Sequence, residues 1–155
     1  MHTFTLIHVI LSLIGIVSGL VVIYGFLAGK RLRPWNSLFL AMTILTSVTG
    51  FFFPLFTGFK GFTPGIILGI VSLVILAVAL LALSKGWTKT YIAMCSVAEF
   101  FNVLVLIAQS FAKIPALHAF APKGNEPIVA ICQGTAFLIL AVLAVVAMRK
   151  KAFAL

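Results

Sequence analysis

Residues 91–113 read Tyr91-Ile-Ala-Met-Cys-Ser-Val-Ala-Glu-Phe-Phe-Asn-Val-Leu-Val-Leu-Ile-Ala-Gln-Ser-Phe-Ala-Lys113, and this stretch decides the fold. It is long enough to cross the hydrocarbon core of a bilayer, which needs about 20 mostly apolar residues. Polar residues nevertheless recur along it in steps of three or four, and at about 100° per residue they share an arc of about 80°. The members of this polar stripe are Tyr91, Cys95, Glu99, Asn102, Leu106, Gln109 and Lys113.

The composition of the whole chain agrees with a membrane helix at its centre. Of the 155 residues, 63% are hydrophobic and 8% are charged. Soluble domains average about 45–50% apolar and about 25% charged residues. The chain therefore has too little polar surface for a water-soluble globule, a disordered tail or a disulfide scaffold. A small integral membrane protein with a single domain over residues 1–155 remains.

Five stretches are long and apolar enough to span a membrane, which predicts an all-α, five-transmembrane-helix bundle. The predicted spans are about 4–28, 36–53, 64–84, 90–112 and 127–148. The first is too long for the core of a signal peptide, and the basic pair after it indicates a stop-transfer signal. The segment 113–126 is too apolar for a solvated loop and too short to span, so we expect an interfacial or re-entrant segment there.

The distribution of basic residues predicts the orientation. With five spans, eight lysines and arginines fall on one side of the membrane and three on the other. The positive-inside rule then places the N-terminus outside and the C-terminus in the cytoplasm. The same rule explains the net charge of +9, because basic residues in the loops set the orientation of the spans and contact lipid head groups. A nucleic-acid partner is therefore not expected.

The sequence contains no soluble-enzyme motif, and its two acidic residues leave no paired-carboxylate mechanism within one chain. We therefore predict a non-enzymatic protein without catalytic residues or a metal site. The two cysteines, Cys95 and Cys132, fall at different depths of the predicted bundle and are expected to remain unpaired.

The polar stripe has two interpretations. Glu99 near mid-span costs at least about 2.5–3.5 kcal/mol to insert, so it is expected to face protein or water. It serves either as a proton, ion or polar-ligand site, or as a neutral group that hydrogen-bonds neighbouring helices and fixes their packing. Three further polar residues are expected near the outer surface, where an outward-opening polar cavity is geometrically possible: His8, His118 and Gln133. The alternative is that Lys113 extends to the lipid head groups and each glutamine pairs with a backbone carbonyl.

His8 and His118 are also the pair that would have to hold a haem, although His118 lies in a predicted loop. A histidine hydrogen-bonded between helices is the competing interpretation of His8. Small residues at four-residue spacing permit close helix packing. The pairs are Gly15 with Gly19 and Gly65 with Gly69.

Several short runs resemble a family of uncharacterised bacterial inner-membrane proteins of about this length. These runs are Thr49-Gly-Phe-Phe-Phe-Pro, Asn102-Val-Leu-Val-Leu, Lys113-Ile-Pro-Ala-Leu and Asn125-Glu-Pro. The resemblance implies a multi-pass protein of a bacterial inner membrane and brings no activity with it. The family often has serine or threonine before the Glu-Pro pair, where this chain has Gly124-Asn125, so the signature stretch 113–127 is matched incompletely.

Three functions are compatible with these patterns. The leading hypothesis is an accessory or structural subunit that packs against itself or a larger membrane complex through its glycine and serine faces. The second is a small proton, ion or solute transporter or channel whose polar pathway includes Glu99. The third is a haem- or quinone-binding protein that uses His8 and His118.

Overall fold

The computed structural model describes residues 2–53 and 63–150, and within these ranges its only regular elements are helices. The helices are α1 (His2–Leu27), α2 (Arg33–Gly50), α4 (Pro64–Lys85), α5 (Thr88–Lys113), α6 (Pro115–His118) and α7 (Pro127–Arg149). Three residues used in the sequence-based predictions, Pro54, Lys60 and Lys151, lie outside the described ranges.

Four of the described helices are long and apolar enough to cross a membrane, which indicates an integral membrane protein. They are α1, α4, α5 and α7. Helix α2, which corresponds to the predicted span 36–53, is not among the four. It begins three residues earlier than predicted, at Arg33, and ends at Gly50. The charge of Arg33 and the amide of Asn36 therefore fall inside the helix and lower its mean hydropathy.

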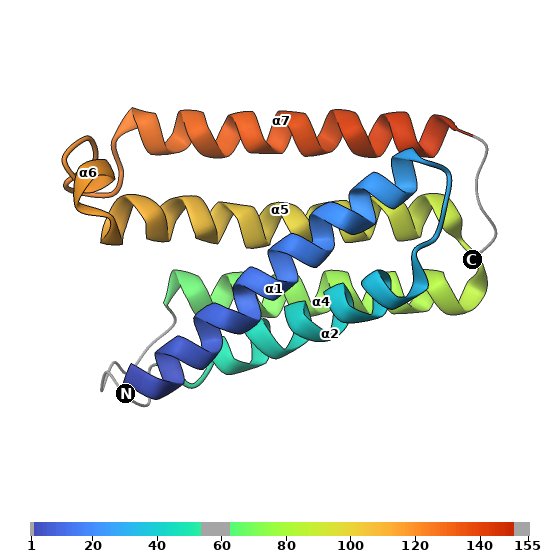
Figure 1. Ribbon diagram of the computed structural model, residues 1–155, viewed down its shortest axis with the longest axis horizontal. Helices are drawn as coiled ribbons and strands as arrows, with labels where there is room; N and C mark the ends of the chain where they lie inside the picture. Colours follow the sequence, from blue (N-terminus) through green and yellow to red (C-terminus); the bar gives the residue numbers. More distant parts are fainter. Residues whose placement is uncertain (1, 54–62, 151–155) are drawn as a thin grey trace.

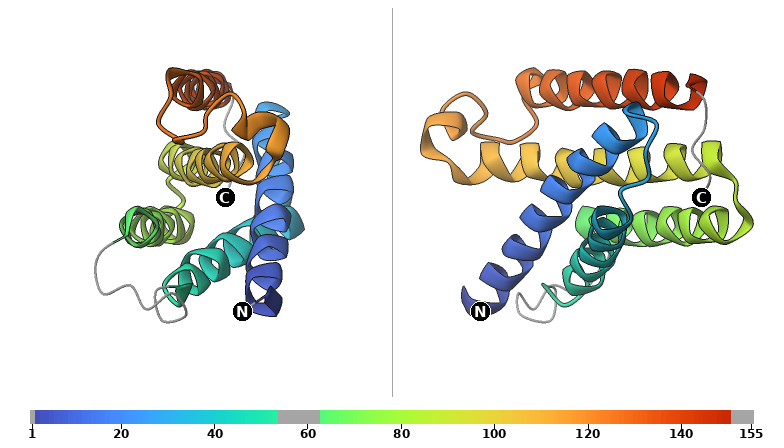
Figure 2. Two further views of the ribbon diagram at one scale, coloured as in Figure 1. Left: turned by 90° about the vertical axis from the view of Figure 1, so that its left-hand side faces the viewer. Right: turned by 45° about the vertical axis from the view of Figure 1, so that its right-hand side comes forward.

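The long helices run alternately in opposite directions across the molecule (Figure 1). Seen end-on, α4, α5 and α7 form one row, while α1 and α2 pack on one side of it (Figure 2). Helix α5 lies at the centre, because it contacts α1, α4 and α7 as well as the short α6. This central position explains how a helix with a polar stripe is accommodated in an apolar bundle.

The two ends of α4 show how local sequence sets its limits. Pro64 occupies the first turn, where a missing N–H costs nothing, and the Thr63 hydroxyl accepts a hydrogen bond from the Ile66 N–H at 3.2 Å. At the other end Gly86 adopts a left-handed conformation with φ +71°. This C-cap allows the chain to reverse within two residues and enter α5 at Thr88.

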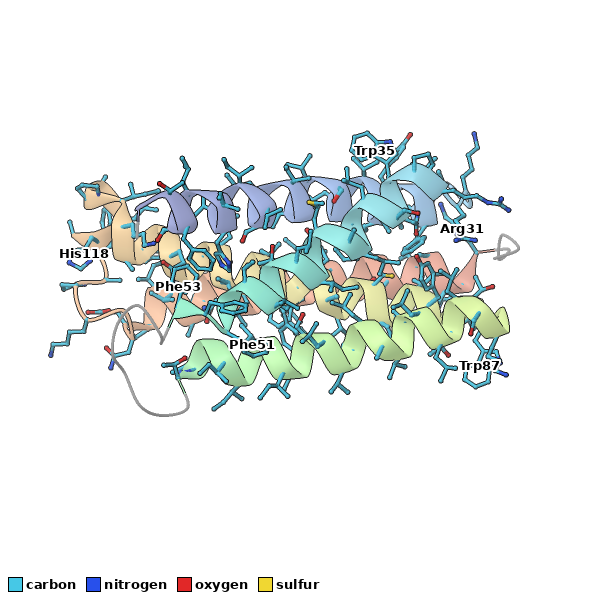
Figure 3. All side chains as sticks on the ribbon, turned by 90° about the horizontal axis from the view of Figure 1, so that it is seen from below. Arg31, Trp35, Phe51, Phe53, Trp87 and His118 are labelled. Atoms are coloured by element: carbon cyan, nitrogen blue, oxygen red, sulfur yellow. The ribbon has the colours of Figure 1, made fainter. Side chains whose placement is uncertain are left out.

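The two ends of the bundle differ in charge. Arg31, Trp35 and Trp87 lie together at one end, and His118 lies at the other (Figure 3). We call the first the basic end, where α1 and α4 end and α2 and α5 begin, and the second the α6 end. At the basic end Lys150 also donates a hydrogen bond of 2.6 Å to the backbone carbonyl of Leu27. Tryptophan and basic residues in this position are typical of a membrane–water interface.

The segment between α5 and α7 turns back at the α6 end. It contains the four-residue helix α6, and Ala121 is buried in a small cluster with Phe111 and Val129. The Phe120 side chain is 71% exposed. The predicted apolar segment 113–126 therefore covers one end of the bundle, held by only a few buried side chains.

Candidate functional site

The polar stripe of α5 divides into two parts with different surroundings. Near the basic end, Tyr91, Cys95 and Glu99 are completely buried. The Tyr91 hydroxyl donates a hydrogen bond of 2.8 Å to the Asn36 side-chain oxygen, which is also buried. The Tyr91 ring packs edge-on against Phe26, with centroids 5.8 Å apart. This part of the stripe joins α5 to α1 and α2.

Glu99 occupies a space that exists because residue 19 is glycine. A Cβ atom placed on Gly19 would collide with the Glu99 carboxyl group and would lie 2.9 Å from the Phe39 ring. Within the described chain neither carboxyl oxygen of Glu99 has a hydrogen-bond partner. Asn102 lies within reach of this carboxyl group, one turn along α5. One N–H of its amide donates to the Thr43 hydroxyl at 3.1 Å.

This environment decides the charge of Glu99. An ionised carboxylate without a partner in an apolar interior costs far more than a neutral carboxylic acid. No basic side chain has an ion pair with Glu99 among the described residues, and the ring of Phe39 and the backbone of Gly19 form its immediate walls. The group is therefore neutral in this arrangement and holds a proton that it can release when water or a counter-charge reaches it.

The rest of the stripe lines a cavity. A cavity of about 540 Å³ lies between α1, α2, α4 and α5 in the half of the bundle nearest the α6 end. Asn102, Leu106, Gln109 and Lys113 of the stripe border it. Asn102 thus belongs to both parts, because it lines the cavity and also lies one turn from the buried Glu99.

His8 enters the cavity wall from α1. Its Nδ1 lies 2.8 Å from the Thr49 hydroxyl oxygen, and that hydroxyl is 2.8 Å from the carbonyl of Leu45. The Thr49 hydroxyl has a single hydrogen. If that hydrogen goes to the carbonyl, Nδ1–H of His8 is the donor toward Thr49; if it goes to the ring, Nδ1 is the acceptor. Nε2 of the neutral ring carries a lone pair in the first tautomer and an N–H in the second.

The wall of the cavity is apolar with a few polar groups. Aliphatic side chains of Val9, Leu13, Ile16, Leu68, Val105 and Leu106 border it. Hydroxyl groups are also present, and two of them, Ser47 and Ser72, bond to each other across α2 and α4 at 3.2 Å. Neither Glu99 nor Glu126 is among the lining residues. Among the described residues, the ionisable side chains that border the cavity are therefore His8 and Lys113.

Two residues expected near this site lie elsewhere. Gln133 donates to the backbone carbonyl of Leu104 at 3.4 Å, on the α5–α7 side. The His118 ring lies 3.3 Å from the carbonyl of Phe111 and does not border the cavity. The structure therefore does not bring His118 to His8 as a pair of haem ligands. In the described ranges, no three His, Cys, Asp or Glu residues are placed to bind a metal ion. Cys95 and Cys132 are unpaired.

The glycines of the predicted packing faces lie mainly inside the bundle. A Cβ atom added to Gly15 would contact α2 and α5, with Thr43 Oγ1 3.5 Å away. A Cβ atom added to Gly69 would lie 3.1 Å from the ring of Phe51, at the end of α2. Gly65 is different, because its nearest neighbour is the capping residue Thr63. Close helix packing by Gly15, Gly19 and Gly69 is thus used within one chain.

Sequence reasoning missed two polar partners on α2, Asn36 and Thr49, which bond to Tyr91 and His8 respectively. Thr43, on the same helix, accepts from Asn102. Each pair lies at one depth of the bundle, so matching the depth of polar residues on different helices is the signal that could have found them.

Comparison with family models, with curated proteins and with solved structures finds no match to this chain. The function is therefore inferred from the geometry of the cavity and of Glu99.

Proposed function

We propose that this chain is a five-span protein of a bacterial inner membrane, with its N-terminus outside, that carries a small solute together with a proton held on Glu99. The observation that carries the proposal is the buried Glu99 carboxyl group, which has no hydrogen-bond partner among the described residues and lies one helical turn beyond Asn102, a residue that lines the cavity. The resemblance to small bacterial inner-membrane proteins supports the choice of membrane.

Three observations support five spans. Helix α2 has 18 residues, about 27 Å at 1.5 Å per residue, close to the roughly 30 Å of a hydrocarbon core. It runs opposite to α1 and α4, between the same two ends of the bundle (Figure 1). Its polar residues are sheltered, because Asn36, Thr43 and Ser47 are buried against other helices.

Cysteine labelling tests the topology. In a chain without native cysteines, single cysteines replace the exposed Lys30, Lys85 and Lys123 in turn. Five spans place positions 30 and 85 in the cytoplasm and position 123 outside. A membrane-impermeant maleimide should then label only position 123 in intact cells. Labelling of positions 30 and 85 from opposite sides would show that α2 does not cross.

The placement of the glycines favours a carrier over an accessory subunit. The accessory hypothesis depended on glycine and serine faces that would contact another protein. Gly15, Gly19 and Gly69 contact residues of their own bundle, and Ser47 and Ser72 bond to each other. The polar stripe likewise faces its own bundle and cavity. These features therefore leave internal binding as the better explanation of the polar residues.

A proton on Glu99 supplies a way to couple binding to movement. The carboxyl group is neutral while it is packed against Gly19 and Phe39. If α1 and α5 move apart and water enters, the free-energy cost of the ionised Glu99 carboxylate falls and the proton leaves. A solute that enters the cavity contacts Asn102, and a shift of Asn102 changes the packing around Glu99, one turn away on the same helix. Solute movement and proton release are thereby linked through one helix.

The chain offers a matched control, since Glu99 and Glu126 are its two acidic residues. The purified protein is reconstituted in vesicles that contain a pH-sensitive dye. An acidic outer buffer is imposed, and a panel of sugars, amino acids and organic acids is added outside. We expect at least one solute to accelerate internal acidification in the wild type and in Glu126→Gln. Glu99→Gln and empty vesicles should show only the background leak.

Equal solute-dependent acidification by Glu99→Gln would show that Glu99 carries no proton in transport. Absence of any solute-dependent acidification in the wild type would contradict the carrier proposal. Native mass spectrometry of the purified protein distinguishes the accessory hypothesis, which expects stoichiometric partner subunits.

A further inference from the structure

We infer that the cavity binds the anion of a medium-chain aliphatic carboxylic acid, with its carboxylate between His8 and Lys113 and its chain among the aliphatic side chains. This inference deepens the proposed function, because it uses the same cavity, but ligand binding is measurable without transport.

The charge of the cavity selects an anion. His8 of α1 and Lys113 of α5 both border the cavity. Neither of the two acidic residues competes for them. Glu99 is enclosed by Gly19 and Phe39, and Glu126 accepts a hydrogen bond of 2.8 Å from the Lys123 backbone N–H. Lys113 therefore has donors available for a carboxylate, which accepts two or more hydrogen bonds.

The orientation of His8 fits this role. Its Nδ1 is committed to Thr49. Its Nε2 has no hydrogen-bond partner among the described residues, although the ring borders the cavity. A bound anion raises the affinity of this ring for a second proton, so that Nε2–H becomes a donor to the ligand. Lys113, at the end of α5, supplies the second donor.

The remaining wall selects an aliphatic chain. Between the charged groups and Asn102, the aliphatic residues Val9, Leu13, Ile16, Leu68 and Val105 border the cavity, and the hydroxyl groups of Ser12, Ser47 and Ser72 stand among them. The eleven residue-to-residue steps from Asn102 to Lys113 span roughly 16 Å along the helix axis. An extended chain of ten carbons, with C–C bonds of about 1.5 Å, is roughly 12 Å long. The volume of 540 Å³ also falls within the roughly 300–1,000 Å³ of small-molecule pockets.

The polarity gradient of the cavity matches that of an amphiphile in a membrane. The charged groups lie toward the α6 end of the bundle, and the aliphatic groups lie toward its middle. At the inner limit, the Asn102 amide donates to the Thr43 hydroxyl. An alkyl chain that ends there leaves this bond intact, whereas a second polar group on the ligand would compete for it.

Decanoate labelled with ¹³C at its carboxyl carbon tests the inference by NMR in phosphatidylcholine nanodiscs that hold the full chain. Empty nanodiscs give the partitioning background. We expect saturable binding at one site, not displaced by decanol or decylamine. Lys113→Gln should weaken it about tenfold, the loss expected for one hydrogen bond to a charged group. Lys123→Gln, which removes an exposed lysine outside the cavity wall, should bind as the wild type does.

A second variant tests the apolar wall. Leu106 borders the cavity and is 38% exposed, so Leu106→Trp fills space without disturbing the buried core. This substitution should abolish decanoate binding while the thermal unfolding temperature stays within a few degrees of the wild type. Undiminished binding by Leu106→Trp would place the ligand outside this cavity.

Three results would overturn the inference. The first is equal affinity for decanol, which would remove the role of charge. The second is an equal effect of Lys113→Gln and Lys123→Gln. The third is displacement of decanoate by phosphatidylglycerol in the nanodisc, which would assign the site to a membrane lipid.

The two proposals fail separately. If the wild type binds no decanoate but still shows Glu99-dependent acidification with another solute, the ligand class is wrong and the carrier remains. If decanoate binds and Glu99→Gln leaves acidification unchanged, the cavity is a binding site and the proton-coupled mechanism is wrong.

Discussion

Helix α5 passes through two environments that its sequence does not distinguish. From Thr88 to Glu99 its polar face is packed without space, and Tyr91, Cys95 and Glu99 are completely buried. From Asn102 to Lys113 the same face borders a cavity of about 540 Å³. The periodicity of the stripe is the same in both halves, so the difference must come from the helices that face it.

The facing helices differ in the size of their side chains. Opposite the first half, Phe26 and Phe39 fill the space around Tyr91 and Glu99. Opposite the second half, small residues border the cavity on α1, α2 and α4. They are Ser12, Ser47, Gly50, Gly65, Gly69 and Ser72. A helix face therefore becomes a site or a packing surface according to the volume supplied by its neighbours.

The largest expected effect compares two leucines, one from each half. Leu76 is 1% exposed in the main core, whereas Leu106 is 38% exposed at the cavity. Leu76→Ala should lower the free energy of unfolding by about 2–5 kcal/mol, because it opens a new void. Leu106→Ala enlarges a cavity that already exists and should lower the free energy of unfolding by less than about 1 kcal/mol. Unfolding by sodium dodecyl sulfate in mixed micelles measures both, and equal losses would show that the halves are equally well packed.

The second effect concerns the contact between α1 and α5. Gly19→Ala places a methyl group on the Glu99 carboxyl and should destabilise the protein by about 1–3 kcal/mol, as overpacking of a core does. Gly134→Ala is the control, because its Cβ would meet nothing within 4 Å. The double variant Gly19→Ala with Glu99→Ala should recover most of the loss. Failure to recover would mean that Phe39, and not Glu99, resists the methyl group.

The halves also differ in how much of them was predictable. The steps of three and four residues placed Tyr91, Glu99, Asn102 and Gln109 on one face of α5, because helical geometry depends only on sequence spacing. Which part of that face would be open could not be predicted. That depends on the rotation of α1, α2 and α4 about their own axes. In apolar sequences, where hydrophobic residues surround each helix, no periodicity records that rotation.

A third, smaller effect tests the packed half alone. Tyr91→Phe removes the hydroxyl that donates to the buried Asn36 oxygen and should lower the free energy of unfolding by about 1 kcal/mol. Tyr24→Phe is the control, because Tyr24 is 68% exposed. Both variants are compared by unfolding in the same mixed micelles. If the two tyrosines prove equivalent, the hydrogen bond to Asn36 contributes nothing to the packed half.

The smallest effect lies beyond the open half, in the segment that follows α6. The backbone N–H of Lys123 donates to Glu126 and holds the pKa of this carboxyl group below its usual value. A lowered folded-state pKa stabilises this contact above the unfolded pKa of about 4.3, and the contribution disappears as the pH falls through the folded value. The protection factor of the Lys123 amide should therefore decline on acidification below about pH 4 and should be low at every pH in Glu126→Ala, which has no side-chain acceptor. Hydrogen exchange measured by NMR checks both.

The depth of residues was easier to predict than their partners. The N-terminal part of α1 and the C-terminal part of α5 were expected at one surface, and His8 and Lys113 do border the same cavity. Gln133 and His118 were expected near the same surface, but they face Leu104 and Phe111. Depth follows from counting residues along each span. The neighbour at that depth follows from helix tilt and azimuth, which the sequence does not encode in any short pattern.

The missing side chain at Gly19 has a consequence for how related chains vary. The space that holds the Glu99 carboxyl is the volume that a Cβ at position 19 would take. The two positions are therefore expected to covary. Chains with an acid at position 99 should have glycine at position 19, and chains with alanine or serine at position 19 should have a shorter residue at position 99. Substitutions at these two positions should accordingly appear together in an evolutionary tree, each permitted only after the other.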